Sequence, residues 1–150
     1  MTAPDPRLIN DIRAASRQMV REFGFMEATL AATDYPPSAV HTILEIGNRG
    51  PMTSLQLAEL LHLEKSSVSR MVRKLIDNGE LRESSDAKDA RFKQLSLTTK
   101  GKHTLAAINE FGQRQVADAL TQLTEAEQRI VRDGLTIYAR ALRMTADRSQ

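Results

Sequence analysis

The chain has 150 residues, no cysteine and a nearly balanced net charge of +2. This length suits one domain with a proper hydrophobic core, and the lack of cysteine excludes disulfides and thiolate metal sites. No run approaches the roughly eighteen apolar residues of a membrane span, and the first residues lack the pattern of a signal peptide. We therefore expect a cytoplasmic protein with no membrane partner.

Charge is unevenly spread along the chain. Residues 64–102 hold ten Lys or Arg and six Asp or Glu, a balance of +4, whereas the remainder holds eleven and thirteen, a balance of −2. A basic region suits a polyanion such as DNA. An ordinary solvated surface could have the same charge, so the function has to be inferred from motifs.

A long amphipathic helix is predicted over residues 7–32, because apolar residues recur there at steps of three and four. The residues of this stripe are Leu8, Ile12, Ala15, Met19, Phe23, Met26 and Leu30. The stripe is longer than one small core can cover, so we expect part of it to face a second chain. Tyr35-Pro36-Pro37 ends the helix, since a residue before proline avoids helical backbone angles.

A helix-turn-helix is predicted in the middle of the chain. A second helix follows the prolines and ends near residues 47–51, and its apolar residues are Val40, Ile43, Leu44 and Ile46. Thr53 and Gln56 have the spacing of a capping box, which opens a third helix. Only residues 62–64 separate this helix from a fourth, and two helices joined by so short a turn make a helix-turn-helix.

The fourth helix is predicted to run to Asn78, with Gly79 as its C-cap. One side carries an apolar ladder of Val68, Met71, Val72, Leu75 and Ile76. The other sides carry short donors and cations, namely Ser66, Ser67, Ser69, Arg70, Arg73 and Lys74. Serine hydroxyls and the first amides of a helix suit phosphate oxygens, and arginine or lysine can reach phosphates or guanine edges.

A β-hairpin, the wing, is predicted after this helix. Leu81 begins a short extended run, residues 92–97 favour a second, and the polar stretch SSDAKDAR between them forms turns. From Thr98 the pattern is helical again, and a second capping box at Thr124 opens a last helix. The predicted fold class is therefore mainly α (α+β), with a small wing.

Two motifs in this region have a defined spacing. In the first, Asp89-x-Arg91 is followed by five residues and then by Leu97-Thr98-x-x-Gly101. The second is the helix-turn-helix stretch LAELLHLEKSSVSRMVRKLIDNGEL. Both resemble the MarR family of bacterial transcriptional regulators, the first matching the family's wing signature without a gap. The order of elements is similar to that of the family over nearly the whole chain.

The chain departs from the family pattern at two positions. His62 stands where glycine is frequent, and a left-handed conformation costs more for histidine than for glycine. Glu64 stands where serine or aspartate is usual, and its side chain is a poorer N-cap. Both departures concern the geometry of the turn and leave the motif intact.

The resemblance implies a single MarR-like domain over residues 1–150. Residues 36–101 would form a winged helix-turn-helix lobe, and residues 7–34 and 102–146 would form dimerisation helices. Such a homodimer binds double-stranded DNA at a pseudo-palindromic operator, with the fourth helix in the major groove and the wing against the minor groove. The expected DNA-binding residues are Ser66, Ser67, Ser69, Arg70, Arg73, Lys74, Lys88, Asp89, Arg91 and Lys93.

The expected wing residues differ in their roles. Arg91 could enter a narrow minor groove, where the negative potential is enhanced. Asp89 could hold Arg91 or Arg82 in place, and a plain turn former is the alternative for this residue. Lys88 and Lys93 would add only electrostatic affinity.

Many family members bind small aromatic or phenolic compounds between the dimer helices and the DNA lobe. The resemblance therefore implies a repressor that a small-molecule effector releases from DNA. The candidate pocket residues are Phe23, Met26, Leu30, Tyr35, His41 and Phe111. An ordinary hydrophobic core is the alternative for each of them, and the low aromatic content does not favour an aromatic cage.

Nothing in the sequence indicates catalysis. His41, His62 and His103 lack metal-ligand spacing, and the sequence has neither a Gly-rich phosphate loop nor a nucleophile elbow. We expect no enzyme, no cofactor and no metal. Two other functions stay open: the regulatory half of a MarR–acetyltransferase fusion, and a winged-helix protein-interaction module, which would bind its partner without sensitivity to salt.

Overall fold

A hydrophobic core between residues 39 and 108 organises the fold of the computed structural model, which describes residues 2–25, 27, 29, 31–85 and 92–149. Its elements are α1 (Pro6–Glu22), α2 (Pro37–Arg49), α3 (Ser54–Leu61), α4 (Lys65–Asp77), β1 (Leu81–Ser85), β2 (Lys93–Leu97), α5 (Thr99–Leu120) and α6 (Glu125–Arg148). The predicted fold class, mainly helical with a two-stranded wing, is confirmed.

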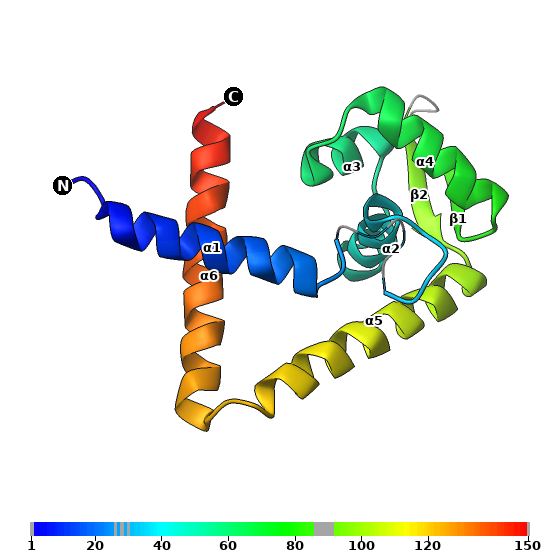
Figure 1. Cartoon of the computed structure of the whole chain (residues 1–150). Coiled ribbons are helices and arrows are strands. Elements are labelled where there is room, and N and C mark those ends of the chain that lie inside the picture. Colours follow the sequence, from blue (N-terminus) through cyan, green and yellow to red (C-terminus); the bar gives the residue numbers. More distant parts are fainter. Residues whose placement is uncertain (1, 26, 28, 30, 86–91, 150) are drawn as a thin grey trace. The chain divides into compact units, whose positions relative to one another are not determined.

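Helices α2, α3 and α4 pack on one another and with the β1–β2 hairpin to form the winged lobe (Figure 1). Each element contributes residues that are fully or almost fully buried, among them Ile43, Leu57, Val68, Leu81 and Leu95. The strands are antiparallel, with Leu81 opposite Leu97 and Arg82 opposite Ser96. Because side chains alternate along a strand, the leucines face the core while Arg82 and Ser96 face away from it.

The turn between α3 and α4 confirms the predicted helix-turn-helix. His62 ends α3 in the left-handed conformation, with φ 55° and ψ 45°. The N–H of Leu63 donates to the carbonyl of Ala58 at 3.0 Å, which satisfies one of the last carbonyls of the helix. At the other end of α3, Thr53 and Gln56 form the predicted capping box. The histidine therefore adopts the backbone conformation for which glycine is better suited.

Helix α4 ends in a Schellman motif that turns the chain into the wing. Gly79 has φ 79° and its N–H donates to the carbonyl of Ile76 at 2.9 Å. The N–H of Glu80 donates to the carbonyl of Leu75, also at 2.9 Å. Glycine adopts a positive φ without steric cost, so the predicted C-cap role of Gly79 is confirmed. Strand β1 then begins at Leu81.

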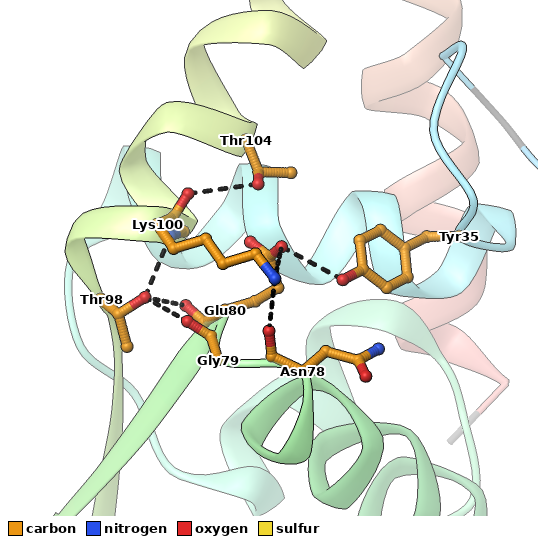
Figure 2. Close-up of polar contacts among 8 residues, drawn as sticks. Tyr35, Asn78, Gly79, Glu80, Thr98, Lys100 and Thr104 are labelled. Carbon is orange, nitrogen blue, oxygen red and sulfur yellow. Dashed lines mark hydrogen bonds and ion pairs between the residues drawn. The ribbon is translucent and has the colours of Figure 1, made fainter.

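Thr98 joins the start of α5 to the end of α4 (Figure 2). Its hydroxyl donates to the carbonyl of Gly79 at 2.5 Å and accepts from the N–H of Gly101 at 3.0 Å, and its own N–H donates to the carbonyl of Glu80 at 3.1 Å. A Cβ added at Gly101 would lie 2.2 Å from that Glu80 carbonyl oxygen. The threonine and glycine of the wing motif therefore have a structural role.

Glu80 buries a carboxylate at this junction and is only 2% exposed. Its Oε1 accepts a hydrogen bond from the hydroxyl of Tyr35 at 3.1 Å (Figure 2). Lys100 Nζ lies 3.8 Å from the same oxygen and donates to the carbonyl of Asn78 at 2.7 Å. Burial and the hydrogen bond to Glu80 raise the pKa of Tyr35 above its ordinary value of 10.0, because both disfavour the ionised phenol.

The prediction of one helix over residues 7–32 is wrong, because α1 ends at Glu22. Gly24 follows in the left-handed region with φ 79°, and its N–H donates to the carbonyl of Arg21. Ala31 and Ala32 also have positive φ, 56° and 55°, which a right-handed helix cannot contain. The apolar period of the sequence continues past Glu22, but the helical conformation of the backbone ends there.

Two units make up the chain, residues 1–111 and residues 112–150. Helix α1 belongs to the first unit and α6 to the second, and α5 contributes to both. The predicted capping box at Thr124 opens α6. All residues of α1 and α6 are described, and none of them is buried within the chain.

We expect Gly101→Ala to lower the free energy of unfolding by about 1–3 kcal/mol, because the added methyl overlaps the Glu80 carbonyl. Urea unfolding would measure the loss. The control is Gly112→Ala in the same helix, where an added Cβ meets no heavy atom of the described residues within 4 Å. That substitution should be neutral or stabilising by up to about 1 kcal/mol. Equal stability of the two variants would contradict the close approach.

The raised pKa of Tyr35 predicts a loss of stability in alkali. Below about pH 10 both the folded and the unfolded states keep the phenol proton, and the stabilisation is fully present. As the pH rises further, the unfolded state ionises first, so the stabilisation is lost as the pH passes through the folded pKa. The wild type should therefore lose stability relative to Tyr35→Phe as the pH rises above about 10. A constant difference between the two unfolding free energies would contradict this linkage.

Candidate nucleic-acid interface

Helix α4 presents a polar face opposite a buried one. Val68, Val72 and Leu75 are buried in the core and fix the rotation of the helix about its axis. Five of the six predicted residues on this helix are exposed, namely Ser66, Ser69, Arg70, Arg73 and Lys74. Ser67 is half-buried at the edge of this face, and Asp77 continues the exposed face one turn after Arg73. The structure thus brings the predicted serines and cations of α4 onto one accessible face.

The first turn of α4 is suited to an anion. Glu64 is the N-cap, and its side chain makes no capping hydrogen bond to the first-turn amides. No acidic residue lies within that turn, and Lys65 is exposed at its start. Helix N-terminal amides attract phosphate oxygens because their N–H groups and the helix dipole point the same way. Lys65 was not among the predicted site residues, although its position directly after the N-cap was visible in the sequence.

Arg82 is the second basic residue absent from the predicted set. Its Nε donates to the hydroxyl of Ser96 at 3.2 Å, across the face of the hairpin that points away from the core. The alternation that begins at the buried Leu81 could have placed Arg82 on this face. In the described structure its partner is Ser96, so the guanidinium has a defined position at the base of the wing.

Lys93 lies on the wing as predicted, and its charge is partly offset. Its Nζ lies 3.5 Å from the carboxylate of Glu83, and the lysine side chain is 60% exposed. Three other predicted wing residues, Lys88, Asp89 and Arg91, lie outside the described residues, so their roles stay predictions.

The candidate effector residues are only partly brought together. Phe25, which the sequence analysis missed, lies between two of them: its ring centroid is 6.0 Å from that of Phe23 and 6.1 Å from that of His41. Phe25 does not belong to the helical stripe, so its place depends on the early end of α1. Tyr35 is half-buried against the core and bonded to Glu80. Phe111 is 38% exposed, and Met26 and Leu30 lie outside the described residues.

The described part of the chain shows neither a metal-binding group nor a membrane-spanning helix. It contains no group of three or more His, Asp or Glu side chains placed to hold a metal ion. None of the helices found there combines the length and the hydropathy that crossing a bilayer requires.

The chain is similar to known proteins in sequence and in fold. The model of the MarR family matches residues 36–93, whereas no curated protein sequence matches the chain. FabT from Streptococcus pneumoniae, solved in complex with DNA, is 23% identical over 94% of this chain and 99% of that chain, with a TM-score of 0.77. RV1404 from Mycobacterium tuberculosis is 19% identical over 94% and 97%, with a TM-score of 0.75. A mutant MarR from E. coli is 19% identical over 93% and 98%, with a TM-score of 0.68.

At identities below 25% these likenesses are likenesses of fold. Together with the MarR family model, which matches residues 36–93 of the winged lobe, they bear out the resemblance that the two sequence motifs carry, and the likeness of fold extends over most of the chain.

Proposed function

We propose that this protein is a sequence-specific, double-stranded DNA-binding transcriptional regulator that acts as a dimeric repressor. The observation that carries the proposal is the two-sided construction of α4, whose apolar side is locked in the core while its other side presents serines, Arg70, Arg73 and Lys74 to solvent. FabT, whose fold is similar, was solved in complex with DNA, and this supports DNA as the partner proposed for the present protein.

Different side chains on α4 would contact the DNA backbone and the base edges. Ser66 and the first-turn amides are suited to backbone phosphates, which position the helix without reading sequence. Arg70 and Arg73 are exposed on adjacent turns and could reach base edges in the major groove. Arg82 at the base of the wing would add a phosphate contact, and Arg91 is proposed for the minor groove on the strength of the sequence motif.

Dimerisation would involve the apolar residues that α1 and α6 leave exposed within one chain. On α1, Leu8 is 54% exposed, and on α6, Ile130 and Ile137 are 68% and 56% exposed. Solvent contact of so many large apolar side chains on two helices is unfavourable and is typical of an interaction surface. A two-fold dimer would present two copies of α4 to a pseudo-palindromic operator.

A small-molecule effector would be received near the aromatic group Phe23, Phe25 and His41. Phe23 and Phe25 lie just after α1, the proposed dimer helix, and His41 lies on α2 of the winged lobe. A ligand that changes the conformation of this segment could lower the affinity for the operator. We propose no enzymatic activity, cofactor or metal.

Arg70→Ala or Arg73→Ala should cost on the order of 1–3 kcal/mol of operator binding if that arginine reads a base. The loss on random DNA should be smaller, so discrimination shrinks. Lys93→Ala is the control and should weaken both kinds of DNA slightly and equally, because Glu83 already offsets its charge. Competition binding at one fixed salt concentration measures all three variants. If every variant loses the same affinity for operator and for random DNA, α4 contacts only phosphates and the proposed contacts of Arg70 and Arg73 with base edges are wrong.

Light scattering at micromolar concentration should show a dimer for the wild type and a monomer for Ile137→Glu, since a carboxylate would be buried unpaired in the interface. Thr136→Glu is the matched control. It adds the same charge one residue earlier, on the polar side of α6, and should stay dimeric. A monomeric wild type, or two variants that behave alike, would exclude this face of α6 from the interface.

A further inference from the structure

Three segments that are distant in sequence meet at Glu80 (Figure 2). Its N–H donates to the Leu75 carbonyl in the last turn of α4, and its carbonyl accepts from the Thr98 N–H at the start of α5. Its side chain accepts from Tyr35, 45 positions earlier in the chain. Strand β1 begins at the next residue, so the directions of both α4 and the wing are set at this one position.

The backbone around Tyr35 is also restrained by local contacts. The N–H of Tyr35 donates to the hydroxyl of Thr33 at 3.1 Å. Pro36 follows with φ −69°, and Pro37 opens α2. The phenol ring packs against the core. A backbone restrained on both sides of the tyrosine means that its hydroxyl can follow Glu80 only if residues 33–37 move with it.

A buried carboxylate is a costly way to fill this position. The Glu80 side chain is only 3% exposed, and a buried charge is unfavourable unless it is paired and hydrogen-bonded. Lys100 is 62% exposed, so solvent weakens its attraction at 3.8 Å. Oε2 has no hydrogen-bond partner among the described residues. The half-buried Tyr35 is therefore the main side-chain partner of Glu80, and an apolar side chain similar in size to the glutamate could fill the same space more favourably.

We propose that Glu80 is a positioning residue. Its hydrogen bond from Tyr35 ties the segment that follows α1 to the end of α4 and the start of β1, and so holds α4 and the wing in one relative orientation. This inference rests on the proposed function, because the orientation matters only if α4 and the wing contact one DNA site together. Without the hydroxyl bond, a smaller fraction of molecules would hold both elements in the DNA-competent arrangement.

The consequence for binding follows from that fraction. The apparent Kd is the intrinsic Kd divided by the competent fraction, so a fall to between a third and a tenth raises the Kd about three- to tenfold. Contacts to phosphate are unchanged, so the dependence of affinity on salt should stay the same. Both single substitutions break the same hydrogen bond, so their effects on operator affinity should not add.

The experiment compares Tyr35→Phe, Glu80→Leu and the double variant on an operator duplex that the wild type has selected from a random pool. Urea unfolding should show that the double variant regains the stability lost in Tyr35→Phe, because replacing both partners by apolar groups removes the unpaired carboxylate. Operator affinity should stay lowered about three- to tenfold in all three proteins. Glu80→Gln retains an oxygen acceptor for Tyr35 and should bind within about twofold of the wild type.

Controls separate positioning from simple core filling. Recovery of operator affinity together with stability in the double variant would overturn the proposal, and so would unchanged affinity in folded Tyr35→Phe. Hydrogen exchange at the Glu80 and Thr98 amides of the DNA-free protein should be faster in Tyr35→Phe. If the wild type selects no duplex, the proposed function fails, and unchanged exchange at these amides is what would overturn the positioning role.

Discussion

The contact of Thr98 with the end of α4 is the constraint on which the winged lobe depends. One hydroxyl donates to the Gly79 carbonyl and accepts from the Gly101 N–H, so it caps the start of α5 and joins that helix to the turn that follows α4. The Schellman motif at Gly79 reverses the chain, and Thr98 meets it from the other end of the hairpin. The wing is therefore closed at its base by backbone hydrogen bonds that do not depend on the residues at its tip.

Helix α4 shows how one short helix can be both structural and functional. Three apolar side chains of α4 are buried, namely those of Val68, Val72 and Leu75. Full burial of a side chain of this kind stabilises the folded state by about 1.5–3 kcal/mol relative to leaving it exposed. That burial holds the opposite face in a fixed direction without using any polar side chain. Serines and cations on this face are then not needed to hold the helix in the core, so the proposed DNA-binding surface could change in sequence without loss of the fold.

Much of this arrangement could be predicted from the sequence because it depends on local patterns. The capping boxes at Thr53 and Thr124, the glycine after α4 and the second extended run of the wing are all short-range signals, and all are confirmed. The end of α1 could not be predicted from the apolar period, since the left-handed backbone at Gly24 interrupts the helix while the period continues. Phe25 was missed for the same reason.

Long-range contacts were the other limit. Tyr35 was predicted to end the first helix and to line an effector pocket or an ordinary core. Nothing local shows that its hydroxyl meets a buried glutamate between α4 and β1. Arg82 was one of two partners predicted for Asp89, which lies outside the described residues, and the described partner of Arg82 is Ser96 on the neighbouring strand. Polar pairs of this kind depend on tertiary packing, and the propensity of single residues carries no information about them.

The separation of 45 positions between Tyr35 and Glu80 also has a consequence for the order of folding. Contacts within the helix-turn-helix and the hairpin are local and close short loops, which is fast, whereas a distant pair has to wait for the intervening chain. During synthesis α1 leaves the ribosome first, but the carboxylate that anchors the segment behind it emerges only after α2, α3 and α4. The segment that follows α1 therefore lacks this hydrogen bond until most of the winged lobe has been made, a stage at which partly folded chains are prone to aggregate.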